Sequence, residues 1–299
     1  MQNQPQSRES LWTILKLLKW AAAYFKSHQI ENPRATAEVL LAHTLGKERI
    51  DLYVCYDQPL ANEELQHFKT LIKKRVEREP VAYITGVKEF WSMEMQVNPA
   101  VMIPRPETEC LVEAVLAQLS GNPDNTPRRI LELGTGSGAI ILALASRLQR
   151  DLFFALDCSI RALRLAQQNA RQHRLGDRIH FFCGDWMKAL KSRGDLFDVI
   201  VSNPPYIKTG LITGLAPEIY RYEPIQALDG GKDGLDCLRL IIDQAHQYLK
   251  DDGRLFLEIG FDQKKSVQDI ITENGNYGET VFGEDYSGCD RVASMKKIG

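Results

Sequence analysis

The stretch Asn203-Pro204-Pro205-Tyr206 combines residue types that can hold an amino group. It follows the apolar run 197–201, which predicts a buried strand that ends in a rigid loop. The side-chain oxygen of Asn203 and the backbone carbonyl of Pro204 can each accept a hydrogen from an NH2 group. The two prolines fix the backbone and offer no N–H donors, and Tyr206 adds an aromatic face. The loop therefore suits a planar amide or an exocyclic amine, although Asn-Pro and Pro-Pro pairs also mark ordinary turns.

A glycine-rich turn lies upstream, between two apolar segments. Residues 129–133 predict a short strand, and residues 141–145 continue as a helical pattern. A turn of this kind brings bare backbone close to a ligand. Gly134, Gly136 and Ala139 match the G-x-G-x-x-A dinucleotide fingerprint. The glycines alone therefore leave open a nicotinamide cofactor or another adenosine-containing one.

Acidic residues follow the next two predicted strands. The strand 152–157 ends in Asp157, whose carboxylate could accept both hydroxyls of a ribose. Asp157 or Ser159 could instead cap the helix that follows. The strand 179–183 leads into Asp185-Trp186, where a carboxylate and an indole could bracket an adenine, or could form a surface turn and a core aromatic.

These features all come at the carboxyl ends of successive predicted strands. Ligands of open α/β sheets bind along that edge, so we expect the features to meet in one crevice. Independent structural accidents would not be expected to converge in this way. From periodicity alone, the sequence predicts a doubly wound α/β sheet.

The order of the features resembles the class I S-adenosylmethionine methyltransferases. Two further stretches, 101–109 and 222–235, resemble the release factor glutamine methyltransferases within that class. The resemblance is specific from about Pro80 to Val292 and looser over the amino-terminal region. A sister group, the ribosomal protein glutamine methyltransferases, typically differs after the shared Pro-Arg, so Arg105-Pro106-Glu107-Thr108-Glu109 favours the release factor branch.

The resemblance implies a fold and a cofactor. It implies a Rossmann-like sheet of seven strands, one of them antiparallel, with an N-terminal helical bundle domain. It also implies S-adenosylmethionine as cofactor and S-adenosylhomocysteine as product, without a metal. The residues that it carries into the cofactor site are Gly134, Thr135, Gly136, Ser137, Gly138, Asp157, Asp185, Trp186 and Asn203.

The resemblance also implies the reaction, methyl transfer to the glutamine of a Gly-Gly-Gln loop in class 1 peptide chain release factors. The lone pair of an amide nitrogen is delocalised into its carbonyl, and the sequence offers no evident general base. Asn203 and Pro204 would instead accept both amide hydrogens, which raises electron density on the nitrogen and aims it at the methyl group. Tyr206 would pack against the substrate side chain, or serve as a core aromatic.

Further residues are expected on the substrate side. The substrate-binding set comprises Asn203, Pro204, Pro205, Tyr206, Arg105, Glu107 and Glu223. Arg105 and Glu107 would line the mouth of the site, although Glu107 and Glu109 could instead complement the positive end of a helix. Glu223 and the Gly230-Gly231 turn would shape the substrate side, or only the loop itself.

Charge and composition narrow the class of partner. The chain has 299 residues, a formal net charge of −2 and a pI near 6.3, which gives no electrostatic footprint for nucleic-acid binding and favours a protein substrate. The dispersed cysteines and histidines suggest neither a metal site nor a disulfide framework. The polar start and the lysines after Ser10 predict neither a signal peptide nor a membrane span. We expect a cytoplasmic monomer.

Other functions stay open at this level. A similar loop can hold the amino group of a flipped adenine, so adenine N6 methylation of nucleic acid is one alternative. Glutamine methylation of a ribosomal protein is another. A non-catalytic module that only binds the cofactor is a third.

The sequence predicts three regions. Residues 1–80 show helical apolar spacing and predict a bundle for release factor docking, with helices over 11–28, 35–45 and 62–78. Residues 81–106 are expected to form a hairpin linker, and residues 107–299 the methyltransferase domain. The other expected elements are a polar loop at 120–127, helices over 159–174, 235–249 and 264–274, a strand over 253–260, and strands near Val281 and over 291–295.

Overall fold

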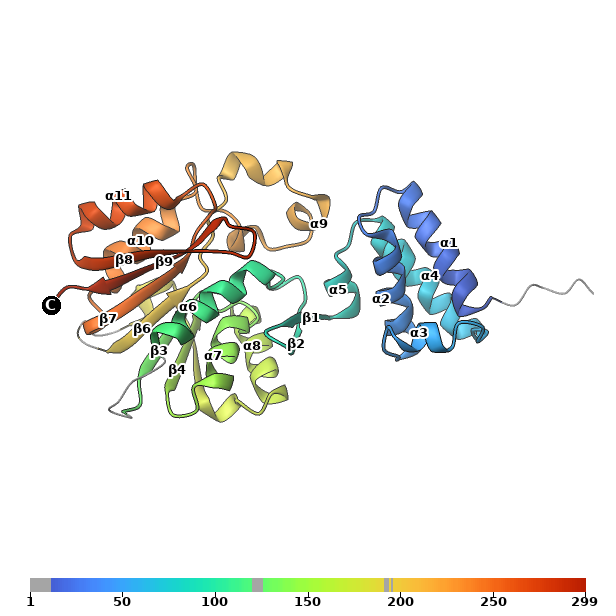
Figure 1. The fold of residues 1–299 in the computed structure, drawn as a ribbon, viewed down its shortest axis with the longest axis horizontal. Coiled ribbons are helices and arrows are strands. Elements are labelled where there is room, and N and C mark those ends of the chain that lie inside the picture. Colours follow the sequence, from blue (N-terminus) through green and yellow to red (C-terminus); the bar gives the residue numbers. More distant parts are fainter. Residues whose placement is uncertain (1–11, 120–125, 191–193, 195) are drawn as a thin grey trace, which may run out of the picture. The chain divides into compact units, whose positions relative to one another are not determined.

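The computed structural model describes residues 12–119, 126–190, 194 and 196–299. The chain divides into two compact units, Met1–Gly86 and Val87–Gly299 (Figure 1). The predicted polar loop at 120–127 lies largely outside the described residues. Every helix within the described ranges is too short or too polar to cross a bilayer.

The first unit consists of helices. They are α1 (Ile14–Ser27), α2 (Pro33–Leu45), α3 (Asp51–Val54), α4 (Asn62–Val76) and α5 (Val81–Thr85). Apolar side chains at helical spacing meet in one core, which includes the almost fully buried Phe25, Leu40 and Phe68. Thr13 caps α1 through a hydrogen bond from the Lys16 backbone N–H at 3.5 Å. The helical bundle predicted from apolar spacing is confirmed.

A buried acid joins three side chains within this unit. Glu38 on α2 is 2% exposed and accepts hydrogen bonds from Arg34 at 2.5 Å, Arg49 at 2.7 Å and Tyr53 at 2.5 Å. Burial opposes its ionisation, but these hydrogen bonds outweigh burial and lower the pKa of Glu38 to about 2.

The hairpin expected over 81–106 is shorter than predicted. Residues Val81–Thr85 form helix α5, and only β1 (Val87–Phe90) and β2 (Met93–Gln96) form the antiparallel hairpin. The prediction was wrong for 81–86 because Pro80 precedes a helical turn and Gly86, with φ of 79°, ends it. The adjacent residues Tyr83 and Ile84 are both buried, as in a helical turn and unlike a strand with one exposed face.

The second unit contains a seven-stranded sheet in the order β5-β4-β3-β6-β7-β9-β8. Its strands are β3 (Arg129–Leu133), β4 (Leu152–Asp157), β5 (Ile179–Cys183), β6 (Phe197–Ser202), β7 (Leu249–Glu258), β8 (Tyr277–Glu284) and β9 (Asp290–Lys297). Strand β9 is antiparallel to both of its neighbours, whereas β3 to β7 pair in parallel. The expected fold class is therefore confirmed.

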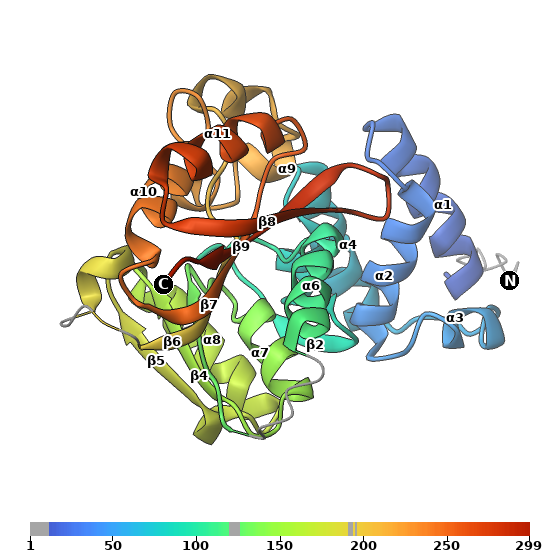
Figure 2. The ribbon, with the colours of Figure 1, turned by 60° about the vertical axis from the view of Figure 1, so that its left-hand side comes forward.

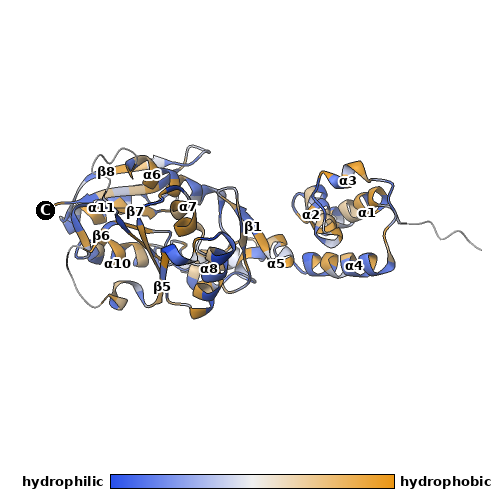
Figure 3. Cartoon of the chain, turned by 90° about the horizontal axis from the view of Figure 1, so that it is seen from below, coloured by the Kyte–Doolittle hydropathy of each residue, from blue (hydrophilic) through white to orange (hydrophobic). Residues whose placement is uncertain are grey.

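Helices cover both faces of this sheet (Figure 1, Figure 2). They are α6 (Glu109–Leu119), α7 (Ala139–Arg147), α8 (Ile160–Gln172), α9 (Pro217–Tyr220), α10 (Asp236–Ala245) and α11 (Lys264–Asn274), with 3-10 turns at Pro106–Thr108, Gly176–Arg178, Trp186–Ala189, Thr209–Gly214 and Ile225–Ala227. Val199 and Val201 join the core formed with α6 and α7, whereas Ile200 joins the core formed with α10 and α11. Helix α7 is hydrophobic over most of its length, as Figure 3 shows, because both the sheet and α6 cover it.

The helix predicted over 235–249 ends earlier, at Ala245. Strand β7 begins at Leu249, which pairs with Phe197, and the pairing then shifts so that Arg254 faces Val199. A turn around Asp252, with φ of 64°, takes up the extra residues. The predicted strand over 253–260 is thus the second part of β7.

The order of the strands creates a switch point between β3 and β6. From β3 the chain adds β4 and β5 on one side, and then returns to add β6 and β7 on the other side. At this point Leu133 pairs with Ser202, whose hydroxyl donates to the Leu133 carbonyl at 2.8 Å. The glycine loop and the loop after β6 therefore begin side by side at the edge where ligands of such sheets bind.

Candidate active site

A cleft of about 370 Å³ opens at this switch point, within the second unit. A cleft of this size suits a small organic ligand. Of the residues predicted from the sequence, those that line it are Gly134, Thr135, Gly136, Ser137, Asp157, Asp185, Trp186, Asn203 and Pro205. The four features expected to converge in one crevice do so. The predicted residues Arg105, Glu107, Gly138, Pro204, Tyr206 and Glu223 are not part of the lining.

The glycines of the loop differ in what they do. Gly136 has φ of 55° with open space where a Cβ would stand, so ligand can approach the bare backbone there. A Cβ at Gly138 would lie 2.5 Å from Leu142 Cδ1 and 3.2 Å from Ala166 Cβ. Gly138 therefore allows α7 and α8 to pack closely, and does not face the cleft.

Backbone N–H groups of the glycine loop donate hydrogen bonds to acceptors within the protein. Gly134 and Thr135 donate to the Leu156 carbonyl at 2.8 and 2.9 Å, and Gly136 donates to Asp157 Oδ2 at 2.9 Å. These groups are thus not presented as a cradle for a pyrophosphate. The cleft is also lined by the acids Glu132, Asp157 and Asp185, against a single arginine, Arg161. Acidic side chains thus outnumber basic ones around the cleft, which favours a cationic ligand over a dinucleotide.

Asp157 connects the glycine loop to the next helix. Its Oδ1 accepts from the Ser159 backbone N–H at 2.8 Å while Oδ2 accepts from Gly136. Ser159 is the residue that caps α8, by accepting from Ala162 N–H at 3.2 Å. A carboxylate has about four acceptor positions, so Asp157 retains capacity for ligand hydroxyls.

Glu132 is a cleft residue that sequence reasoning did not assign to the site. It is 1% exposed near the end of β3, and burial raises the pKa of its carboxyl to about 8. The Thr135 hydroxyl donates to Glu132 Oε2 at 2.5 Å and opposes this shift. The sequence did contain one indication of a role for Glu132, because a charged residue is unusual inside the apolar run 129–133.

The residues 203–206, called the acceptor loop below, present their groups in different directions. Asn203 Nδ2 donates to Thr108 Oγ1 at 3.1 Å, which leaves the side-chain oxygen to accept. Pro204 is buried. The Tyr206 hydroxyl donates to Glu258 Oε1 at 3.0 Å, and its ring packs against the core on the α10 and α11 side. The Tyr206 ring thus contributes to the core, and its contact with the substrate side chain stays a prediction.

Arg105 and Glu223 bind each other. Arg105 Nη2 lies 2.6 Å from Glu223 Oε1, and the Ile103 backbone N–H donates to Glu223 Oε2 at 3.3 Å. Burial raises the pKa of Glu223, although Arg105 favours its charged form. This pair ties the 101–109 segment to the 222–235 loop, and both segments contribute neighbouring residues to the cleft. Glu107 is exposed.

The 222–235 loop also lies directly against the acceptor loop. The Ile207 N–H donates to the Leu228 carbonyl at 3.0 Å, and the Gly230 N–H donates to the Ile207 carbonyl at 2.8 Å. A Cβ at Gly230 would lie 2.8 Å from the Pro205 carbonyl oxygen. The Gly230-Gly231 turn therefore permits a close backbone approach that shapes the acceptor loop.

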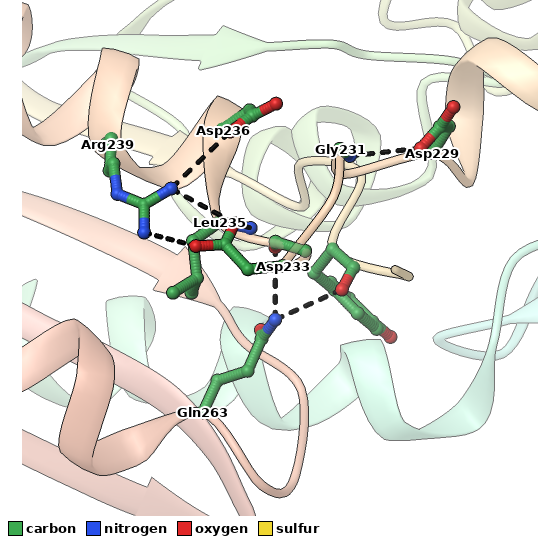
Figure 4. A network of polar contacts seen from close by, with 9 residues as sticks. Asp229, Gly231, Asp233, Leu235, Asp236, Arg239 and Gln263 are labelled. Carbon is green, nitrogen blue, oxygen red and sulfur yellow. Dashed lines mark hydrogen bonds and ion pairs between the residues drawn. The ribbon is translucent and has the colours of Figure 1, made fainter. Parts of the chain in front are cut away.

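Gln263, which sequence reasoning missed, fastens these two loops together. Its Nε2 donates to the Tyr206 carbonyl at 3.1 Å and to the Gly234 carbonyl at 3.0 Å (Figure 4). Its Oε1 accepts from the Gly260 N–H at 2.8 Å. Both amide hydrogens of this buried side chain are used, so its orientation is fixed.

A metal site was not found among the described residues, where no three His, Cys, Asp or Glu side chains gather closely enough to hold an ion.

Comparison with known proteins identifies the family. Residues 16–86 match the family described as PrmC N-terminal domain, and residues 125–294 match the family described as methyltransferase domain. The release factor glutamine methyltransferase of Geobacter sulfurreducens is 40% identical over 285 residues, covering 95% of this chain and 97% of that protein. This chain belongs to the release factor glutamine methyltransferase family. The protein of the same description from Moorella thermoacetica is 40% identical over 279 residues, covering 93% and 96%.

A solved structure agrees at the level of the fold. A methyltransferase from Pyrococcus furiosus superimposes with a TM-score of 0.50 and 17% identity, covering 79% of this chain and 99% of that one. The relatives at 40% identity confirm the family resemblance found in the sequence, and they show that the protein is an enzyme of the methyltransferase class.

Proposed function

We propose that this protein methylates the side-chain amide nitrogen of the glutamine in the Gly-Gly-Gln loop of class 1 peptide chain release factors. The observation that carries the proposal is the orientation of Asn203 in the cleft. Its Nδ2 is bound to Thr108 Oγ1, so its oxygen is the atom able to accept a hydrogen from a substrate NH2 group. The relatives from Geobacter and Moorella are release factor glutamine methyltransferases, which supports a release factor glutamine as the methyl acceptor.

The cleft suits S-adenosylmethionine as cofactor, which supplies an electrophilic methyl group when bound. Glu132, Asp157 and Asp185 compensate the positive charge of a sulfonium and an ammonium group. Asp157 also accepts from ribose hydroxyls, and Trp186 offers an aromatic face to the adenine. The open space at Gly136 lets this ligand approach the backbone.

Catalysis by the chain's own residues rests on orientation. Asn203 Oδ1 accepts one hydrogen of the substrate amide, and the Pro204 carbonyl accepts the other. Both contacts raise the electron density on the amide nitrogen, whose lone pair is otherwise delocalised into its carbonyl, and they direct the nitrogen along one line of attack. Pro205 lines the cleft beside them, while the Arg105–Glu223 pair fixes the shape of its entrance.

The helical unit is proposed to dock the release factor. A Gly-Gly-Gln loop offers few distinctive side chains, so selection among the glutamines of a cell needs a second contact surface. Every residue that lines the cleft falls between Pro99 and Cys237, so the helical unit supplies none of them. The match of residues 16–86 to the PrmC N-terminal domain supports a role for the helical unit that is separate from the cleft.

Labelled S-adenosylmethionine and purified release factor test the proposal directly. We expect label in the natural factor and none in a matched factor whose motif glutamine is replaced by alanine. Asn203→Ala should keep a cooperative melt and lose at least about 100-fold in turnover, the scale seen when one oriented contact to the reacting group is removed. Label in adenine-containing DNA or in a ribosomal protein instead would contradict the proposal, as would near wild-type turnover in Asn203→Ala.

A further inference from the structure

Asn169 connects two walls of the cleft from behind. It lies on α8, is 0% exposed, and makes three hydrogen bonds, all with backbone groups. Its Oδ1 accepts from the Gln96 N–H at 2.8 Å. Its Nδ2 donates to the Gln96 carbonyl at 3.0 Å and to the Ser137 carbonyl at 2.8 Å. One backbone donor and two backbone acceptors therefore converge on a single buried amide.

The chemistry of these three backbone groups requires an amide. Among side chains of this length, a carboxylate accepts but does not donate, and an apolar side chain does neither. Both hydrogens of the Asn169 amide are used, so the side chain cannot rotate without leaving a buried carbonyl unpaired. The three contacts thus fix one orientation of Asn169.

The first wall that Asn169 holds is the glycine loop. Ser137 is 3% exposed and lines the cleft. One turn earlier on α8, Ala166 packs closely against Gly138, where a Cβ would lie 3.2 Å from Ala166 Cβ. The same face of α8 therefore holds the end of the glycine loop twice, by packing at Gly138 and by a hydrogen bond at Ser137.

The second wall is the segment 99–102, which lines the cleft and follows strand β2. Gln96 is the last residue of β2, and two residues separate it from Pro99. Consecutive Cα atoms are about 3.8 Å apart, so the position of the Gln96 backbone limits where this segment can lie. At its other end, the Ile103 N–H donates to Glu223 at 3.3 Å. The segment is thus anchored on both sides, by Asn169 and by Glu223.

We propose that Asn169 is a positioning residue for the cofactor, which sets the distance between the glycine loop and the segment 99–102. This inference rests on the proposed function, because it concerns the S-adenosylmethionine that the cleft is proposed to bind. Asn169 is not part of the lining, so it acts through the backbone of Ser137 and Gln96. A ligand that touches both walls binds more tightly when their spacing is fixed beforehand, since ordering a wall during binding costs affinity.

Asn169→Asp tests this role with almost no change in shape. The variant keeps the acceptor for the Gln96 N–H but removes both donors. Calorimetry with S-adenosylhomocysteine should show a loss in affinity of about tenfold or more, which corresponds to about 1.4 kcal/mol. The KM for S-adenosylmethionine should rise by a similar factor, whereas kcat at saturating cofactor and the KM for release factor should stay within about threefold. Asn169→Ser buries no charge but is too short to reach both carbonyls, so it should show the same pattern.

Gln172→Glu is the matched control. Gln172 lies one turn further along α8, where it accepts from Gln96 Nε2 at 2.8 Å and donates to the Glu94 carbonyl at 3.3 Å near the surface. Its replacement by glutamate removes a donor to the same hairpin but leaves the Ser137 contact intact. The affinity of this control for S-adenosylhomocysteine should stay within about twofold of the natural protein, as expected for a surface change.

Three results would overturn the inference. The first is a folded Asn169→Asp or Asn169→Ser protein that keeps its affinity for S-adenosylhomocysteine, or that loses kcat instead of affinity. The second is an equal loss of affinity in Gln172→Glu, because anchoring of the hairpin alone would then explain the effect. The third is a failure of both Asn169 variants to melt cooperatively, because Asn169 would then serve the fold and not the cleft. Failure of the proposed function looks different, since the natural protein itself would then not bind S-adenosylhomocysteine or methylate release factor.

Discussion

Replacing Gln263 by glutamate should uncouple the two loops that it joins. Gln263→Glu is almost isosteric and keeps the acceptor for the Gly260 N–H, but it removes both donors. The Tyr206 and Gly234 carbonyls, now 3.1 and 3.0 Å from Nε2, would face a carboxylate oxygen. Because Gln263 is 4% exposed, water does not readily replace the lost donors.

The size of the effect follows from these contacts. Two neutral hydrogen bonds contribute about 1 kcal/mol each, and a buried acceptor left without a partner costs about 1–3 kcal/mol more. We therefore expect a loss of about 3–5 kcal/mol in the free energy of unfolding at pH 8. Burial and the facing carbonyls should raise the folded-state pKa of the introduced carboxyl above its unfolded value. The loss should then be small at pH 4–5, where the protonated group can donate once, and should grow as pH rises through the folded-state pKa.

Urea unfolding at pH 5 and pH 8 measures this difference, with methyl transfer to release factor as a second readout. Gln268→Glu is the matched control, because Gln268 lies on α11, the helix that Gln263 immediately precedes, and its side chain donates to Thr272 Oγ1 at 3.3 Å near the surface. The control should stay within about 0.5 kcal/mol of the natural protein, as surface changes usually do. A Gln263→Glu protein that matches this control at pH 8 would refute the view that Gln263 fastens the acceptor loop.

Other predictions concern the cofactor, the helical unit and acid stability. Asp157→Ala should weaken S-adenosylmethionine binding by about 1.5–3 kcal/mol, since ribose hydroxyls lose a charged acceptor. If calorimetry shows unchanged affinity, Asp157 does not bind the ribose and serves only to hold the backbone N–H groups of Gly136 and Ser159. Near pH 7 the binding of this cation should release protons, because Glu132, with a pKa of about 8, is largely protonated beforehand and ionises beside positive charge. Calorimetry in buffers of different ionisation enthalpy detects the release, and Glu132→Gln should remove it. Deleting residues 1–86, which includes α5 because it belongs to the first unit, should leave cofactor binding intact and sharply reduce methylation of release factor; a cooperatively melting truncation that methylates as efficiently as the full chain would exclude docking by the bundle. Glu38 should add at most about 3 kcal/mol of stability above pH 4.5, lost as pH falls toward its folded-state pKa of about 2, and Glu38→Gln should flatten that part of the acid unfolding curve.

Local patterns predicted most of the sheet because strand ends carry local signals. The strands expected over 152–157 and 179–183 coincide with β4 and β5, since each is an apolar run that stops at polar or glycine residues. The start of β7 could not be predicted in this way. Leu249 is a strand residue because Phe197 pairs with it, and that pairing depends on the assembled sheet.

The site residues likewise differ in whether the local sequence could predict them. Residues in the glycine loop and in the acceptor loop stand in short motifs directly after strands, and the topology brings them into one cleft. Glu258 and Gln263 have no such motif, since their importance comes from hydrogen bonds that cross 52 and 57 positions of the sequence. The ion pair of Arg105 with Glu223 is equally remote in sequence, and it joins two residues that are expected on the substrate side.

The supports of the acceptor loop have a consequence for a chain that is still being synthesised. Thr108 precedes Asn203 by 95 positions, whereas Glu258 and Gln263 leave the ribosome after the loop that they hold. An unfinished chain that stops before β7 already carries the glycine loop and the Asn-Pro-Pro-Tyr sequence, but it lacks these anchors. It also lacks β9, which pairs with β7 in the completed sheet. We therefore expect an unfinished chain to lack methyl transfer activity until the last strands have emerged and completed the sheet.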